Sequence, residues 1–360
     1  MTTGEFTPRR IPPVCGFNLL EKFAWKEGAE RGRRFSEWDF DFLVAHGFRF
    51  ARLPMDYRCW TTDLAGPPTD GAGAGRQIDP TVLDEIAEAV EMGKARGIHV
   101  CLNVHRAPGY CINRPEIEPF NLWTDQAARD AFAHHWGALA ERFADYSADE
   151  CSFDLLNEPP SYGQRGFTPT AHRQVMGQAV EAIRAVSPAR LIICDGAAVG
   201  TQPADELADL GVGQSMRGYC PAEVTHYKAH WCGRPEGYVW PTPRWPMPDA
   251  NDPAAPPWDA ARLRRDLYDP WRAFQARGVG VHCGECGVYQ FTPPEVTYAF
   301  LDDLLGIFRA NGWGWALWNL RGSFGVLDNG REGAKTEPCD GHQLDRRMLE
   351  ILKSHIPARG

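Results

Sequence analysis

The chain lacks long apolar runs, and this absence limits what kind of protein it can be. No stretch of its 360 residues approaches the roughly 20 apolar residues of a membrane-spanning helix. The first residues, "MTTGEFTPRRIPPVCGF", also lack the apolar segment that a secretory signal needs. We therefore expect a cytoplasmic protein, or an already processed secreted one, without a membrane partner.

Clusters of positive charge are also missing. The chain has 47 Asp and Glu against 38 Lys and Arg, for a formal net charge of -9. Nucleic acids and anionic membranes attract clustered Lys and Arg, whereas the basic groups here, such as "ERGRRF", are short and mixed with acids. The charge pattern argues against a nucleic-acid binder. No heptad repeat or other interaction motif indicates an oligomeric state.

Several other signatures are absent. The segment "GFNLLEKF" lacks the GxGxxG spacing of a dinucleotide-binding loop, and no HExxH motif occurs. No linker rich in Ser or Gly divides the chain, so we expect a single domain over residues 1–360. The eleven cysteines are scattered, and several lie inside predicted strands, which is typical of buried free thiols in a reducing compartment.

What the sequence does contain is a regular alternation of short strand-like and longer amphipathic segments. Such alternation implies right-handed βαβ crossovers and a parallel sheet, and eight repeats close a (β/α)₈ barrel. We predict this α/β fold, a TIM barrel, with an open doubly wound sheet as the alternative. The predicted strands are 14–20, 48–54, 98–105, 151–158, 190–196, 222–227, 279–285 and 313–319, and the main predicted helices are 80–95, 126–146, 171–186, 260–276 and 294–310.

Polar and aromatic side chains follow the predicted strands at their C-terminal ends, which meet at one face of a barrel. Two carboxylates in one pocket suit glycoside hydrolysis, where one protonates the leaving oxygen and the other attacks the anomeric carbon or activates water. A neighbouring arginine would keep one carboxylate ionised, and a tryptophan would stack on a sugar ring. The residues at these ends are Arg52, His105, Asn157, Glu158, His226, Tyr227, Glu285 and Trp318.

A Pro- and Trp-rich loop spans residues 232–258, and its prolines exclude both a helix and a central strand. It follows the predicted sixth strand, so in a barrel it would lie on the face that carries active sites. We expect it to cover the barrel mouth or to contact substrate through at least one of Trp240 and Trp245.

Five motifs in this order resemble glycoside hydrolase family 5, the cellulase family: "RLP", "NVH", "LLNEPP", "CGECG" and "WALWNLRGSFGVLD". The resemblance covers nearly the whole chain from "GFNLLEKF" onward. It implies a retaining double displacement with Glu158 as acid/base and Glu285 as nucleophile, whose carboxyl groups lie about 5 to 5.5 Å apart. It implies no cofactor and no metal.

The resemblance also implies roles for the neighbouring residues. Asn157 would bind the 2-hydroxyl of the sugar in the cleaved subsite, and His105 would bind a neighbouring hydroxyl. Arg52 would support the nucleophile, and Trp318 matches the family's stacking tryptophan.

One motif departs from the family pattern, which has His-x-Tyr on strand six. This chain reads Thr225-His226-Tyr227 in the predicted sixth strand. Either Tyr227 lies beside the nucleophile and Thr225 replaces the histidine, or His226 keeps its place and Lys228 replaces the tyrosine. We favour the first register.

The expected function is therefore retaining hydrolysis of a β-linked glucan, mannan or related oligo- or polysaccharide. A transglycosylase shares every residue named above, and a carbohydrate-binding barrel without turnover is a second alternative. A metal-dependent hydrolase built on residues 282–286 is a third. Because side chains alternate across a strand, those residues do not all face one ion, and their spacing fits no closed zinc site.

Overall fold

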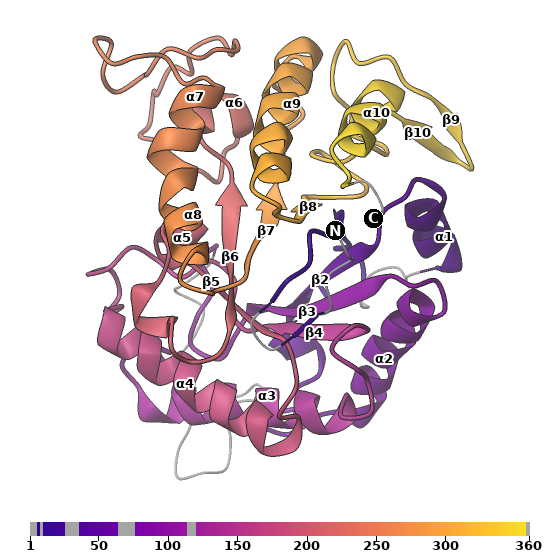
Figure 1. Ribbon diagram of the computed structural model, residues 1–360, viewed down its shortest axis with the longest axis vertical. Helices are drawn as coiled ribbons and strands as arrows, with labels where there is room; N and C mark the ends of the chain where they lie inside the picture. The colour runs from indigo at the N-terminus through magenta and orange to yellow at the C-terminus, as the bar shows by residue number, and fades with distance from the viewer. Residues whose placement is uncertain (1–5, 8–9, 26–35, 64–75, 114–119, 358–360) are drawn as a thin grey trace.

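The computed structural model describes residues 6–7, 10–25, 36–63, 76–113 and 120–357. Within them, eight parallel strands follow one another in chain order and close into a barrel, with the last strand pairing with the first (Figure 1). The predicted (β/α)₈ barrel is confirmed. The strands are β1 (Cys15–Asn18), β2 (Phe50–Asp56), β3 (His99–Arg106), β4 (Cys151–Asp154), β5 (Ile192–Asp195), β6 (Gly213–Gly218), β7 (Val281–Cys286) and β8 (Trp315–Leu317).

Helices surround the barrel, and the longer ones bury an apolar side against it. Their starts follow from the sequence: Asp79 and Thr168 cap α2 and α4 through their side chains, and a proline stands at the first helical position of both. The helices are α1 (Glu37–Ala45), α2 (Pro80–Lys94), α3 (Gln126–Arg142), α4 (Pro169–Val186), α5 (Ala197–Gly200), α6 (Ala222–Thr225), α7 (Ala260–Arg262), α8 (Asp269–Gln275), α9 (Pro294–Ala310) and α10 (Arg346–Ser354).

Shorter elements complete the chain. A π-helical segment, η4 (Leu263–Tyr268), joins α7 to α8, so the predicted helix over 260–276 is continuous but not α-helical throughout. Two 3₁₀ turns, η1 (Tyr57–Cys59) and η3 (Asp205–Leu207), lie in loops. An antiparallel hairpin of β9 (Glu337–Cys339) and β10 (His342–Leu344) precedes α10.

The predicted sixth strand is wrong. Residues 222–227 begin with the short helix α6, and β6 lies upstream at Gly213–Gly218, "GQSMRG". This strand has few apolar residues because its polar side chains find buried partners: Gln214 pairs with both backbone groups of Ala204, and Ser215 accepts from Arg217. Apolar periodicity therefore could not reveal it. Pro221 at the N-terminal cap position precedes a helical turn in place of a strand.

Two further expectations concern membrane-spanning segments and cysteines. No described helix has the length and apolarity that crossing a membrane requires. No disulfide joins the cysteines in the part of the chain that the structure describes, and most of them are buried, as predicted.

The barrel is closed so tightly between β1 and β2 that Gly16 has no room for a side chain. A Cβ at this position would lie 1.7 Å from the carbonyl oxygen of Phe50, its partner in the sheet. We predict that Gly16→Ala lowers the free energy of unfolding by about 1–3 kcal/mol or more, since backbone must move to relieve the clash. Urea denaturation would measure this loss.

Gly177→Ala is the matched control, because a Cβ there meets no atom within 4 Å inside α4. It should gain up to about 1 kcal/mol from helix propensity. Equal stability of Gly16→Ala and the wild type would contradict the pairing of β1 with β2.

Candidate active site

The two predicted carboxylates are brought together at the C-terminal ends of the strands. Glu158 lies just after β4 and Glu285 near the end of β7, and both contact the guanidinium of Arg217 from β6. Arg217 Nε donates to Glu158 Oε1 at 3.0 Å, and Arg217 Nη2 lies 3.4 Å from Glu285 Oε1. The carboxyl groups thus lie on either side of one fixed positive charge.

A second guanidinium, that of Arg52 on β2, lies behind Glu285. Its Nη1 donates to Glu285 Oε1 at 2.6 Å, and its Nε donates to Asp154 Oδ2 at 2.7 Å. Asn18 accepts a further bond from Nη1 at 3.0 Å and donates to the backbone carbonyls of β7 and β8 at Gly284 and Leu317. The buried arginine therefore links β1, β2, β4 and β7 into one rigid base.

Glu285 is held in its ionised form. Burial alone would raise the pKa of Glu285, but the charges of Arg217 and Arg52 outweigh burial and bring this pKa below its ordinary value. Tyr219 also donates its hydroxyl to Glu285 Oε2 at 3.2 Å. An ionised, hydrogen-bonded carboxylate at this position has the properties of a nucleophile.

The pKa of Glu158 is shifted in the opposite direction. Burial and the negative charge of Glu285 raise the pKa of Glu158 to about 7, although Arg217 counteracts them. Its backbone has φ of 49°, in the left-handed region, and is held on both sides: the N–H donates to Asp195 Oδ2 at 2.8 Å and the carbonyl accepts from Tyr110 at 2.6 Å. Such strain is typical of functional positions.

Asn157 lies between the two arginines. Its Oδ1 accepts from Arg52 Nη2 at 3.1 Å and from Arg217 Nη2 at 2.8 Å. Because Oδ1 accepts both bonds, the orientation of the amide is fixed, and Nδ2, its hydrogen-bond donor, points away from the arginines. This nitrogen is buried and has no partner among the residues that the structure describes. A donor is therefore available beside the carboxyl groups.

His105 and Trp318 form an aromatic pair at the same face of the barrel. Their rings are stacked with centroids 5.4 Å apart, and the imidazole Nδ1 lies 3.3 Å from Asn103 Oδ1. Burial lowers the pKa of His105 to about 4, so the ring is neutral at pH 7. Both side chains are half-buried, which leaves part of each ring accessible.

Neither predicted register of Thr225-His226-Tyr227 is correct. The tyrosine beside Glu285 is Tyr219, directly after β6, and Arg217 stands two residues before it. His226 packs edge-on against Tyr219 with ring centroids 5.0 Å apart, so it lies one layer further from Glu285. Tyr227 contacts Trp240 instead, at 6.1 Å between centroids.

The two loop tryptophans are separated by the structure. Trp240 lies among Tyr227, Tyr238 and Arg234 in the 232–258 loop and is half-buried. Trp245 donates its Nε1 to Asp303 of α9 at 2.7 Å and packs against Phe300 of the same helix. Trp245 thus anchors the loop to an outer helix and is not brought to the carboxylates.

Comparison with known proteins agrees with this arrangement. The family model described as Cellulase (glycosyl hydrolase family 5) matches residues 32–323. The chain belongs to glycoside hydrolase family 5. A crystal structure described as that of a glycoside hydrolase is 39% identical, with a TM-score of 0.87 over 95% of this chain and 99% of that chain. No curated protein matches the sequence.

More distant structures share the fold of this glycoside hydrolase. Thermotoga maritima Cel5A in complex with mannotriose is 21% identical, with a TM-score of 0.71 over 94% of this chain and 97% of that chain. The cellulose synthase subunit Z of Clostridioides difficile is 18% identical, with a TM-score of 0.72 over 94% and 99% of the two chains.

Sequence reasoning missed several residues of this family 5 site. Arg217 and Tyr219 were hidden because their strand was not recognised. Asp195 was within reach, since it ends the predicted fifth strand in "RLIICDG". Asp154 and Asn18 lie inside or at the end of correctly predicted strands, but nothing in the sequence marks their side chains as partners of Arg52.

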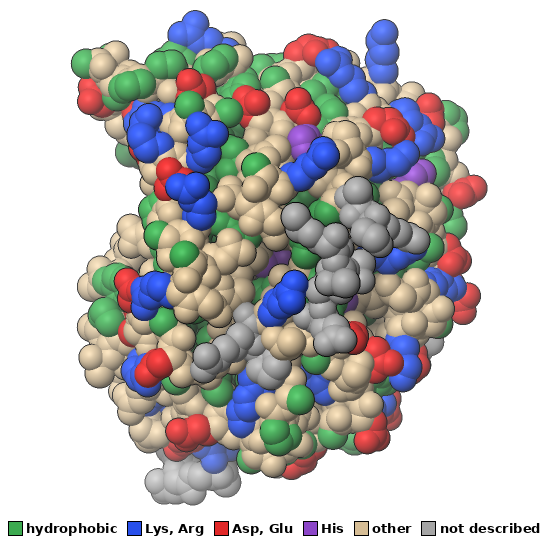
Figure 2. Space-filling model, in the orientation of Figure 1, with side chains coloured by type: hydrophobic (Ala, Val, Ile, Leu, Met, Phe, Trp, Pro, Cys, Tyr) green, Lys and Arg blue, Asp and Glu red, His purple; other side chains and the backbone are tan. Residues whose placement is uncertain are grey.

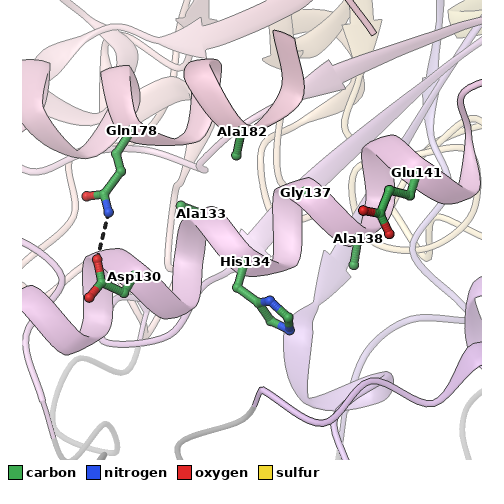
Figure 3. A pocket seen from close by; sticks show the side chains of 8 residues that line it. All are labelled: Asp130, Ala133, His134, Gly137, Ala138, Glu141, Gln178 and Ala182. Atoms are coloured by element: carbon green, nitrogen blue, oxygen red, sulfur yellow. Dashed lines mark hydrogen bonds between the residues drawn. The ribbon is translucent and has the colours of Figure 1, made fainter. Parts of the chain in front are cut away.

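The rest of the described surface carries no comparable constellation. A hollow of about 320 Å³ lies between α3 and α4, where Gln178 donates to Asp130 at 2.7 Å beside His134 (Figure 3). Figure 2 shows acidic and basic side chains intermixed over the visible face. Among the described residues, no group of three or more His, Cys, Asp or Glu is placed to hold a metal ion.

The raised pKa of Glu158 predicts a pH-dependent cost in stability. Below the unfolded pKa of about 4.3 both states bind the proton and there is no cost. As pH rises from there to the folded value of about 7, only the folded state keeps the proton, so stability falls. Glu158→Gln, which can still accept from Arg217, should therefore gain stability over the wild type by roughly 1–3 kcal/mol between pH 5 and pH 8.

Thermal and urea unfolding at both pH values would measure this gain. Glu181→Gln, an exposed glutamate on α4, controls for the removal of one negative charge. A stability difference between Glu158→Gln and the wild type that is the same at pH 5 and pH 8 would contradict the raised pKa.

Proposed function

We propose that this glycoside hydrolase cleaves β-glycosidic bonds with retention, using Glu285 as nucleophile and Glu158 as acid/base. The observation that carries the proposal is the pair of carboxyl groups with oppositely shifted pKa values on one guanidinium. Retaining glycosidases need such a pair close together, one group ionised and one protonated at the same pH.

In the first step, Glu285 attacks the anomeric carbon while Glu158 gives its proton to the leaving oxygen. The bond between the anomeric carbon and this oxygen breaks, and an ester forms between the sugar and Glu285. In the second step, water attacks the same carbon and gives a proton to Glu158. The ester bond breaks, which returns Glu285 as a carboxylate.

The electrostatics of the site support this exchange of roles. The negative charge of Glu285 is one of the causes that raise the pKa of Glu158. Formation of the ester removes that charge, so the pKa of Glu158 falls when the group must act as a base. Arg217 donates to Glu158 throughout and favours the ionised form that the second step requires.

The neighbouring side chains supply binding groups for the sugar. The unpartnered Nδ2 of Asn157 is suited to the 2-hydroxyl, and the stacked pair of His105 and Trp318 offers a ring face and a neutral hydrogen-bonding group. Structures of Thermotoga maritima Cel5A are described with mannotriose and with cellobiose, so related barrels accept both sugar types. We propose a β-linked glucan, mannan or related oligosaccharide as the substrate.

Transglycosylation is the second candidate, and one exposed ring favours it. Trp231 is 46% exposed and packs edge-on against His226, which itself contacts Tyr219 beside Glu285. A sugar stacked on this ring would compete with water for the ester. Products longer than the substrate would identify this reaction.

We predict that Glu285→Ala abolishes turnover, because no ester can form. Glu158→Ala should lose about 10²–10⁴-fold on glycosides with poor leaving groups and little on activated aryl glycosides, whose phenolates leave without protonation. Release of phenol from aryl β-glucosides, mannosides and cellobiosides, compared with hydrolysis of the matching oligosaccharides, measures both effects.

Glu141→Ala, at the outer hollow between α3 and α4, is the control for removing a glutamate and should keep full activity. Equal losses of Glu158→Ala on activated and unactivated substrates would remove its role as acid. Undiminished phenol release by Glu285→Ala would remove Glu285 as nucleophile.

A further inference from the structure

Arg217 is buried in the site and hydrogen-bonded through every nitrogen of its guanidinium. It stands two residues before the tyrosine that donates to Glu285, at the place that the histidine has in the His-x-Tyr pattern of the family. Its side chain is 1% exposed, and each nitrogen of the guanidinium donates within the protein. Nε donates to Glu158, Nη1 to Asp195 Oδ1 and Ser215 Oγ at 3.0 Å each, and Nη2 to Asn157 and Asp195 Oδ2. No donor is left over for substrate.

Asp195, at the end of β5, determines where this guanidinium lies. Its side chain is 0% exposed, and both carboxylate oxygens accept hydrogen bonds from Arg217. The same carboxylate accepts the backbone N–H of Glu158 at 2.8 Å and so supports the left-handed backbone there. The buried carboxylate of Asp195 thus fixes both the guanidinium of Arg217 and the main chain of Glu158, whose carboxyl group this guanidinium contacts.

We propose that Arg217, seated by Asp195, is a positioning residue that holds Glu158 and Glu285 in register and sets the proton affinity of the acid/base. This inference rests on the proposed function for the roles of the two glutamates. A guanidinium suits the task because its planar fork can bond several carboxylates at once. It also keeps its charge at every working pH, whereas a histidine would lose its charge near pH 6.5.

The charges around Glu158 act in opposing directions. Glu285 and Asp195 raise the pKa of Glu158, and Arg217 lowers it. Removing Arg217 or Asp195 should therefore move the titration of Glu158 in opposite directions. The other charged or titratable groups of the site are Arg52 on β2, His105 on β3, Tyr110 in the loop after β3, Asp154 on β4 and Tyr219 after β6.

The test reads the carboxyl group of Glu158 directly. Protein labelled with ¹³C at the glutamate side-chain carboxyl is titrated by NMR, and the Glu158 signal is identified by its absence in Glu158→Gln. In Arg217→Gln the midpoint should rise by about one pH unit or more. In Asp195→Asn it should fall, and in Arg217→Lys, which keeps a positive charge, it should stay near the wild type.

The alkaline limb of the pH profile of kcat/KM should move with the NMR midpoint in each variant. An unchanged midpoint in Arg217→Gln would overturn the proposal. Midpoints that move in the same direction in Arg217→Gln and Asp195→Asn would also overturn it, because general loosening of the site would have that effect. Absence of turnover by the wild type would contradict the proposed function, while the NMR midpoints would still decide the role of Arg217.

Arg217→Gln leaves Asp195 buried without its partner, which can prevent folding. The double variant Asp195→Asn/Arg217→Gln removes both charges together. Its Glu158 midpoint should lie above that of Asp195→Asn alone by about one pH unit or more. Equal midpoints in these two variants would contradict the electrostatic role of Arg217.

Discussion

Two buried guanidinium groups, those of Arg52 and Arg217, are the interaction on which the site depends. A buried charge is unfavourable unless it is paired and hydrogen-bonded, and here the arginines and the surrounding carboxylates satisfy one another. Their bonds join residues from β1, β2, β4, β5, β6 and β7, so the charges lie on strands that the closed barrel keeps in place. The same charges separate the pKa values of Glu158 and Glu285, because Glu285 lies between both arginines while Glu158 meets only Arg217.

The barrel contributes rigidity at the point where the chemistry is proposed to occur. The strand ends cannot shift relative to one another without breaking the sheet. Glu158 lies beyond β4, in a left-handed backbone conformation. Asp195 and Tyr110 bond its two backbone groups and compensate for that strain. The 232–258 loop, in contrast, is anchored to the outer helix α9 through Trp245, while Trp240 packs against Tyr238 within the loop.

The sequence was sufficient to predict the barrel, because seven strands and the main helices follow the apolar patterns typical of a parallel sheet covered by helices. It was also sufficient to find Glu158, which follows β4, Glu285, which lies near the end of β7, and Arg52, which lies within β2. It failed at β6, because its buried polar side chains, such as Gln214 and Ser215, leave no apolar pattern. That failure displaced the tyrosine motif by eight residues, from Tyr219 to Tyr227. The contact of Trp245 with α9 depends on how the loop folds back, which no local pattern encodes.

The central claim is that Glu285 forms a covalent bond to the sugar while Glu158 moves the proton. The most direct measurement is mass spectrometry of the protein after incubation with a 2-deoxy-2-fluoro β-glycoside that carries a good leaving group, made from a sugar that the enzyme hydrolyses. The fluorine slows the breakdown of the ester, so the intermediate accumulates. A covalent bond to Glu285 requires one added fluorosugar on the peptide that contains Glu285, and none in Glu285→Gln. A label on any other residue, or ordinary turnover with no label at all, would contradict it.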